Sequence, residues 1–324
     1  MSKIVAGLAS SHAYAFLAPE QWDERRKFTR ANYARRYGSE PPDRPEIDEE
    51  TLEDNQARFQ AIRGGFATLR SEFDRLQPDA WILIGDDQDE NYRENNLPQF
   101  AIYTGDEFVT GGRGEQIGQH YTCDAELSRA LLEGCVENGF DLASSKTFPN
   151  GLISHAHRDV MRFLDPQGKV PMVPIFVNAI HVPAPSPRRC FEFGQILRET
   201  IEAQPDNKRV AVYASGGWSH FTAGYPYEHL EGPHPVGYIA ADFDQKLATL
   251  VSAGRLSEVT QLSSSDLLNN GDIEFRQWIV MLGMLGDAPP DQFAYQPFFR
   301  GVMGMAVGYW NLENSTKAVA TSGR

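Results

Sequence analysis

Three short apolar runs of this sequence each end in a loop of small residues that carries a side chain able to bind a metal or move a proton. Runs this short, rich in Val and Ile and closed by Gly or Ser, are typical of buried strands. In an open α/β sheet, sites form just beyond the carboxyl ends of the strands. We therefore expect an enzyme site, with a metal as the favoured cofactor, where the three loops meet. The runs and the side chains that follow them are residues 4–8 with His12, residues 80–84 with Gln88, and residues 210–214 with His220.

Two candidate residues suit a metal. Two neutral nitrogen or oxygen ligands and one carboxylate, with positions left open, are typical of non-haem Fe(II) enzymes that activate oxygen. His12, in a Ser-Ser turn, and Glu274 are the best ligands. Asn270 or Asp272 would cap the following helix, which places Glu274 in its first turn, where the helix dipole favours a carboxylate. A purely structural charge at the helix start is the alternative role of Glu274.

Further histidines suggest proton transfer and substrate binding. His220 follows Ser-Gly-Gly-Trp-Ser, and its unperturbed pKa of about 6.5 suits a general base near neutrality. His155 and His157 form an HxH pair, a spacing that can place both rings on one face of a strand. The alternative is one functional histidine beside an exposed one. The string from Ser215 to Ser219 does not fit G-x-S-x-G, which disfavours a serine hydrolase.

Strand and helix patterns alternate along most of the chain. Apolar residues between 59 and 73 recur at spacings of three and four, which predicts a helix that ends before Pro78. Further strands are expected over 99–103 and 170–177, and further helices over 125–137, 191–203 and 240–252. This alternation predicts a layered α/β fold. Without a dividing linker or a repeat, we expect a single domain over residues 1–324.

The composition is that of an acidic chain without signals for nucleic acid or membrane. Of the 324 residues 41% are hydrophobic, and the formal net charge is −14. Nucleic-acid binding depends on Lys and Arg that neutralise phosphates, and no basic stripe is visible. No segment approaches the roughly 20 apolar residues of a membrane span, and no signal peptide is recognised. The three cysteines are far apart and form no CxxC pair, which disfavours a thiolate zinc site and fits a reducing, cytoplasmic location.

Taken together, these motifs resemble the class III extradiol ring-cleaving dioxygenases, the group of the protocatechuate 4,5-dioxygenase β subunit. The resemblance covers nearly the whole chain, and it depends on the combination of motifs rather than on any single one. The segments that carry it are SSH at 10–12, GDDQ at 85–88, LPQFAI at 97–102, PIFVN at 174–178, PSPRRCF at 185–191, GGWSH at 216–220 and IEFRQW at 273–278.

The resemblance implies both a fold and a chemistry. The fold is one α/β domain with a central mixed sheet flanked by helices on both faces. The cofactor is Fe(II), held by two histidines and one glutamate, with His12 and Glu274 in two of these places. His220 matches the catalytic acid/base histidine, and His155 matches a second active-site histidine that contacts substrate or the oxygen adduct. The implied substrates are O2 and a small aromatic diol of the protocatechuate, gallate or 3-O-methylgallate type.

One position departs from the family pattern. Where the family usually reads Asn-Asp-His, this chain reads Asp86-Asp87-Gln88, and counting back from Pro98 places Gln88 at the second histidine ligand. A Gln amide oxygen is neutral, as imidazole is, but it is a harder and weaker donor for Fe(II). The Gln form is similar to single-subunit relatives that act on methylated gallates. The other candidates for this metal ligand are Asp89, Glu90 and His157.

A second departure is an insertion between about residues 19 and 54. In two-subunit members of the family a small helical partner covers the active site, and no such domain is fused here. We expect the insertion to supply the cover, so that no separate small subunit is required, and we expect a homodimer. The substrate-binding residues are expected to be His157 and Arg158. Arg188 and Arg276 are further candidates to bind a substrate carboxylate.

Two other interpretations of the sequence remain open. A Zn(II)-dependent hydrolase or lyase could use the same metal-binding residues, because altered ligands change metal preference. A metal-free binding homologue could have lost its metal through Gln88. The joint presence of His12, His155, His220 and Glu274 disfavours this second interpretation, since an inactive site has no need of all four.

Overall fold

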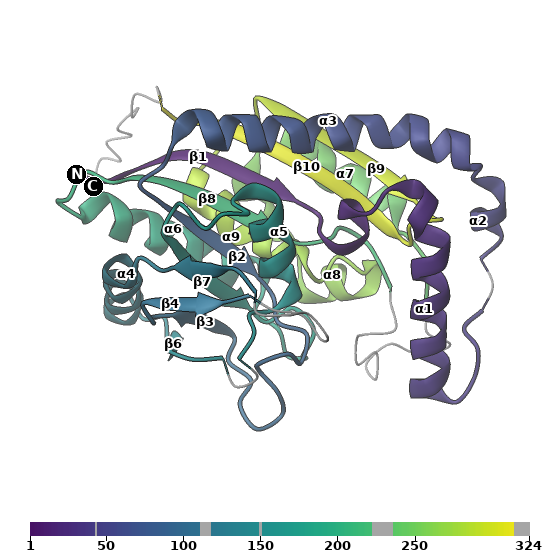
Figure 1. The fold of residues 1–324 in the computed structure, drawn as a ribbon, viewed down its shortest axis with the longest axis horizontal. Helices are drawn as coiled ribbons and strands as arrows, with labels where there is room; N and C mark the ends of the chain where they lie inside the picture. The colour runs from purple at the N-terminus through teal and green to yellow at the C-terminus, as the bar shows by residue number, and fades with distance from the viewer. Residues whose placement is uncertain (43, 111–117, 149–150, 222–235, 314–324) are drawn as a thin grey trace.

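The computed structural model of this chain describes residues 1–42, 44–110, 118–148, 151–221 and 236–313. These residues form an α/β domain in which an eight-stranded mixed sheet lies between two layers of helices (Figure 1). The expected fold class is therefore confirmed. Within the described ranges, no helix is long and apolar enough to cross a membrane.

The sheet places the predicted strands beside one another. Its order is β6-β3-β7-β2-β8-β1-β10-β9. The four central strands β7, β2, β8 and β1 run parallel, whereas β3 is antiparallel to β7, and β10 is antiparallel to both β1 and β9. Strands β4 and β5 pair antiparallel in a separate two-stranded sheet. The strands are β1 (Lys3–Ser10), β2 (Ala80–Gly85), β3 (Phe100–Tyr103), β4 (Glu107–Val109), β5 (His120–Thr122), β6 (Ala143–Ser145), β7 (Met172–Val177), β8 (Arg209–Ser215), β9 (Gln292–Phe298) and β10 (Met303–Asn311).

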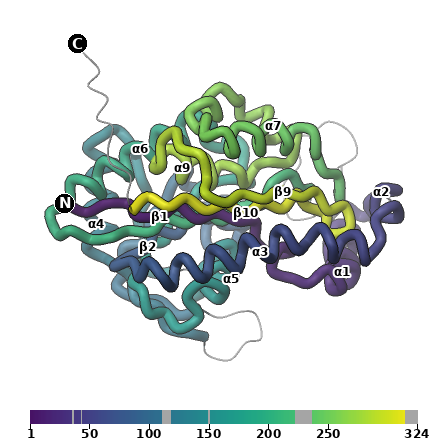
Figure 2. The backbone as a smooth tube through the Cα atoms, turned by 90° about the horizontal axis from the view of Figure 1, so that it is seen from above, coloured from purple at the N-terminus to yellow at the C-terminus, as the bar shows by residue number. Residues whose placement is uncertain are grey.

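Helices cover both faces of the sheet because the strands alternate their buried side chains between the faces. In β2, Ile82 and Ile84 pack into the core under α4, α6, α7 and α9, whereas Trp81 and Leu83 pack into the core under α3 and α5. Figure 2 shows α6, α7 and α9 on one side of the sheet and α3 and α5 on the other. The helices are α1 (Pro19–Tyr37), α2 (Pro45–Glu49), α3 (Leu52–Leu76), α4 (Ala125–Glu137), α5 (His155–Leu164), α6 (Pro187–Ala203), α7 (Ala241–Ser252), α8 (Ser264–Asn270) and α9 (Phe275–Leu285), with short 3-10 turns η1 (Ala13–Phe16) and η3 (Leu256–Gln261).

The segment over about 19–54, which the sequence analysis expects to be an insertion, consists mainly of the long helix α1, which lies with α2 at one end of the molecule (Figure 1). Trp22 of α1 is fully buried and packs on Phe59 and Phe298. The guanidinium of Arg300, in the turn between β9 and β10, forms a two-pronged ion pair with Asp23 at 2.9 and 2.6 Å. These contacts hold the segment against α3, β9 and the turn between β9 and β10.

Two local predictions near the site were wrong. Asn270 is the last residue of α8, and Asp272 does not cap α9; Glu274 itself is the N-cap residue of α9, without a side-chain capping bond. Gly271, in a left-handed conformation, ends α8 and starts a new turn, which the sequence pattern alone did not reveal. His155 and His157 lie at the start of helix α5 rather than on a strand, so their side chains point in different directions.

Candidate metal centre and active site

The candidate site forms where the carboxyl ends of three parallel strands meet. The order β2-β8-β1 places these strands side by side, and each is followed by one of the loops singled out in the sequence. His12 follows β1, residues 86–88 follow β2, and His220 follows β8. Glu274 enters from the turn before α9, which packs against β8. This arrangement agrees with the general position of sites in open α/β sheets.

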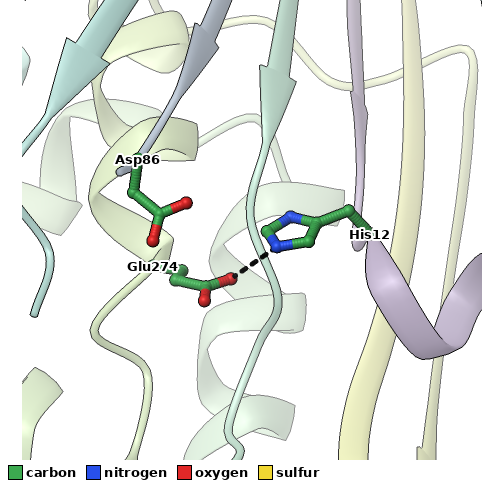
Figure 3. Close-up of side chains that lie close together, drawn as sticks. All are labelled: His12, Asp86 and Glu274. Atoms are coloured by element: carbon green, nitrogen blue, oxygen red, sulfur yellow. Dashed lines mark ion pairs between the residues drawn. The ribbon is translucent and has the colours of Figure 1, made fainter. Parts of the chain in front are cut away.

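Three side chains at this edge form a cup that could hold a metal ion, hereafter the metal cup: His12, Asp86 and Glu274. One ligand atom from each lies within 4.8 Å of the others, and all three residues are buried. Figure 3 shows the two carboxylates and the imidazole converging from separate elements, with Nε2 of His12 3.7 Å from Oε2 of Glu274. One imidazole and two carboxylates are a donor set suited to a divalent first-row cation.

His12 presents a lone pair to the metal cup. Oγ of Ser215 donates its only hydrogen to the carbonyl of Ala156 at 2.7 Å, so it can only accept from Nδ1 of His12, 3.2 Å away. Nδ1 therefore carries the proton, and Nε2 faces Glu274 unprotonated. Burial lowers the pKa of His12 to about 4, which keeps the ring neutral at physiological pH. A neutral histidine with its second nitrogen anchored is the form that binds metals.

Glu274 is held from several sides. Its Oε2 accepts a 2.7 Å hydrogen bond from the backbone N–H of Gly217, and its Oε1 accepts one from Nε2 of Gln88 at 2.8 Å. The loop after β8 can approach this closely because it contains glycines: a Cβ on Gly216 would lie 2.3 Å from the carbonyl oxygen of Glu274. The carboxylate is therefore oriented by the same loop that carries His220.

Asp86 is a member of the metal cup that the sequence reasoning missed. Its Oδ2 accepts from Gln88 at 3.1 Å, and within the described residues its Oδ1 has no hydrogen-bond partner. Burial, followed by the charge of Glu274, raises the pKa of Asp86 well above its usual value. Two buried carboxylates this close require a cation or a proton. The position of Asp86, the first polar residue after β2, was the signal that could have identified it.

His220 lies beside the metal cup with both nitrogens facing acceptors. Its Nδ1 is 2.7 Å from the carbonyl oxygen of Trp218, and its Nε2 is 3.2 Å from Oε1 of Glu274. A carbonyl and a carboxylate only accept hydrogen bonds, which favours a proton on each nitrogen. Burial lowers the pKa of His220, but the Glu274 carboxylate more than offsets this and leaves the pKa raised.

His155 also borders the metal cup. Its ring makes an edge contact with the ring of His12, with centroids 5.1 Å apart. Glu90 accepts from the His155 backbone N–H at 3.0 Å and lies 3.1 Å from its Nδ1. Burial opposes the charged ring, but Glu90 outweighs burial and raises the pKa of His155 to about 9. The structure thus brings His155 together with His12, His220 and Glu274, as expected from the sequence.

His157 does not reach the site. It is fully buried, packs on the ring of Phe176, and has both ring nitrogens engaged: Nδ1 lies 2.7 Å from Oγ of Ser154 and Nε2 lies 3.0 Å from the carbonyl oxygen of Ile175. The expectation that His157 binds substrate or metal is therefore corrected to a structural role. The reason is its place on a helix, where a residue two positions from His155 points to another side.

The remaining candidate metal ligand and the three candidate arginines for substrate binding lie in different surroundings. Asp89 pairs with His181 at 2.8 Å rather than with the metal cup. Arg158 is half-buried, pairs with the neighbouring Asp159 at 3.3 Å, and its charge helps to lower the pKa of Glu90. Arg276 is buried and donates to the backbone carbonyls of Pro185 and Ile273, so it is unavailable to a substrate, whereas Arg188 is exposed on α6.

The comparison with known sequence families identifies the family of this chain. Residues 45–306 match the family described as the catalytic LigB subunit of aromatic ring-opening dioxygenase. The chain belongs to this family. LigB relatives are ring-cleaving extradiol dioxygenases, so the resemblance recognised in the motifs is confirmed.

The individual relatives share less than a third of their aligned residues with this chain. The gallate dioxygenase of Pseudomonas putida is 29% identical over 50% of this chain and 45% of its own length. The 2,3-dihydroxyphenylpropionate/2,3-dihydroxicinnamic acid 1,2-dioxygenase of Klebsiella pneumoniae is 21% identical over 72% of this chain and 85% of its own. The match therefore spans about half the length of the gallate dioxygenase, at 45%. The crystal structure of an uncharacterized Escherichia coli K12 protein has a TM-score of 0.47 at 13% identity, covering 94% of this chain and 99% of that one.

Proposed function

We propose that this protein cleaves the ring of an ortho-dihydroxylated aromatic compound beside its two hydroxyl groups, using O2 and Fe(II). The observation that carries the proposal is the convergence of a buried metal cup with two proton-carrying histidines, His220 and His155, at one edge of the sheet. Membership of the LigB family supports the same chemistry. His12 and Glu274 would hold the metal, with a third ligand from the loop after β2.

When bound, the metal would supply the Lewis acidity that lowers the pKa of a phenolic hydroxyl and the redox chemistry that O2 requires. The protein would supply proton transfer at a fixed position. Because Nδ1 of His220 is anchored on the carbonyl of Trp218, the proton that can be exchanged sits on Nε2, beside the metal cup. His220 would release this Nε2 proton when Glu274 binds the metal. The neutral ring would then accept a proton from the substrate hydroxyl at Nε2 and return it as the ring opens.

His155 would act mainly through its charge. Glu90 holds its imidazole in the protonated form, so a positive charge lies within ring contact of His12. This charge would attract and orient an anionic diol next to the metal cup. Its Nδ1 is bonded to Glu90, so a proton that His155 donated to the reaction would come from Nε2.

The substrate class follows from the arginine that shares a helix face with His155. Arg158 lies three residues later on α5, a spacing that puts both side chains on the same face. Its guanidinium hydrogen-bonds the adjacent Asp159 and acts on the charge of Glu90, and it would turn from Asp159 to a substrate carboxylate. We infer a diol that carries a carboxylate on its ring or side chain, such as protocatechuate, gallate or 3-O-methylgallate.

The insertion would form part of the wall around the site. Tyr33 of α1 packs with Val236, and Nε of Arg44 donates to the carbonyl of Val236 at 3.1 Å. This segment is tied to the His220 loop, since the N–H of Gly237 donates to the carbonyl of Phe221 at 2.9 Å. The insertion would therefore contact a segment that is hydrogen-bonded to Phe221, the residue after His220.

Oxygen uptake tests the proposed function. The protein is loaded with Fe(II) without oxygen, then given O2 and catechol, protocatechuate, gallate or 3-O-methylgallate in turn. We expect uptake with a carboxylated diol, together with the absorbance of a ring-opened product. Product formation that needs Zn(II) and consumes no O2 would identify a hydrolase or lyase instead. Retention of iron without uptake for any ortho-diphenol would reject the proposal.

A further inference from the structure

We propose that Asp86 is the third metal ligand of the cup, and that Gln88 is a positioning residue whose amide N–H groups hold the two carboxylate ligands in place. This inference rests on the proposed metal-dependent function. It gives to Asp86 the place that the sequence pattern assigned to Gln88, and it makes the ligand set one imidazole and two carboxylates.

The surroundings of Asp86 are those of a ligand. The side chain is fully buried, one of its oxygens lies within 4.8 Å of the ligand atoms of His12 and Glu274, and Oδ1 has no hydrogen-bond partner among the described residues. A buried carboxylate oxygen without a donor costs free energy unless a cation pairs with it. Its backbone is fixed as well, because the carbonyl of Asp86 accepts a 2.7 Å hydrogen bond from Oγ of Ser154.

Gln88 presents its amide nitrogen, not its oxygen, to the metal cup. Its Nε2 lies 2.8 Å from Oε1 of Glu274 and 3.1 Å from Oδ2 of Asp86. Ionised carboxylates only accept hydrogen bonds, so the two neighbours require the NH2 group on this side. The amide group of Gln88 thus donates to both carboxylates. Residues that do not bind a metal themselves commonly orient its ligands through such hydrogen bonds.

Metal binding, rather than turnover, tests this assignment. Binding of Mn(II) to the metal-free protein is measured by calorimetry for the wild type, Asp86→Asn, Gln88→Leu and Asp89→Asn. We expect Asp86→Asn to weaken binding about a hundredfold and Gln88→Leu about tenfold. Asp89→Asn changes a carboxylate in the same loop that pairs with His181, so its affinity should match the wild type.

Two further readouts separate a ligand from a structural residue. Asp86→Asn keeps the size of the side chain and an oxygen that can accept from Gln88, so the metal-free variant should melt close to the wild-type temperature while binding metal poorly. The visible spectrum of the Co(II)-loaded protein should be preserved in Gln88→Leu, because the ligand set is unchanged. Wild-type affinity in Asp86→Asn, or a changed Co(II) spectrum together with the larger loss in Gln88→Leu, would overturn the assignment.

Failure of this inference is distinguishable from failure of the proposed function. If the wild type binds metal through Asp86 but takes up no oxygen with any diol, the ligand assignment stands and the ring-cleaving function falls. If the wild type cleaves a diol while Asp86→Asn keeps full metal affinity, the function stands and Asp86 is not a ligand.

Discussion

Oγ of Ser215 lies 3.2 Å from Nδ1 of His12 and donates to the carbonyl of Ala156, so the end of β8 fixes which nitrogen of His12 faces the metal cup. This relationship joins two strands that are adjacent in the sheet but about two hundred residues apart in the chain. It makes Ser215 a residue that affects the metal without touching it.

Ser215→Ala should therefore weaken metal binding by roughly tenfold, since the anchor of a ligating histidine is lost. Calorimetric titration with Mn(II) measures the change. Ser10→Ala is the matched control: Ser10 is a buried serine of the neighbouring strand whose hydroxyl contacts Tyr213, not His12. An equal loss of affinity in both variants would mean that any buried serine at this edge matters, and the specific role of Ser215 would be rejected.

His220→Phe should lower kcat by roughly 10²–10⁴-fold, the usual contribution of a general acid/base, while the metal content stays the same. Glu274→Ala should lose the metal itself, because it removes a buried carboxylate of the metal cup. Metal analysis and oxygen uptake on the two variants distinguish these roles. A metal-loaded His220→Phe protein with near-wild-type turnover would remove His220 from the mechanism.

His157→Phe should destabilise the fold without changing the KM for substrate. The substitution keeps the ring against Phe176 but removes the hydrogen bonds to Ser154 and Ile175. Leaving buried polar groups without a partner should lower the free energy of unfolding by roughly 1–3 kcal/mol. Urea unfolding of the metal-free protein and steady-state kinetics measure the two effects. A severalfold rise in KM at unchanged stability would restore His157 as a substrate-binding residue.

Arg44→Ala tests the insertion as part of the wall around the site. Arg44 donates to the carbonyl of Val236, and its guanidinium lies 5.6 Å from the ring centre of Tyr238. Loss of these contacts should lower kcat/KM by roughly tenfold, because the segment that bonds Phe221, next to His220, is no longer held in position. Metal affinity should not change.

Arg35→Ala provides the control for the insertion, since Arg35 is exposed on α1 and bonds only Asn32 of its own helix among the described residues. Point substitutions are preferable to deleting the insertion, because deletion would remove the fully buried Trp22 from the core. Equal kinetics in Arg44→Ala and the wild type would mean that the insertion stabilises the fold without shaping the site.

Much of the fold could be predicted from local patterns. The apolar runs that become β1, β2 and β8 are short and rich in β-branched residues, and the three-and-four spacing between residues 59 and 73 lies within α3. The general rule for open α/β sheets, that sites form beyond the carboxyl ends of the strands, predicted that the loops of His12 and His220 meet at one edge. Glu274 joined them through the motifs that resemble the family.

The sequence by itself therefore determined the layered fold, the edge of the sheet that carries the site, and the residue types available there, because these depend on periodicity and on which residues follow the strands. Only the tertiary structure decided which atoms meet. Asp86 rather than the oxygen of Gln88 turns into the metal cup, and His157 turns away from it. Such choices depend on side-chain direction at a strand end or around a helix, and on partners such as Ser215 that are distant in sequence, so no local pattern encodes them.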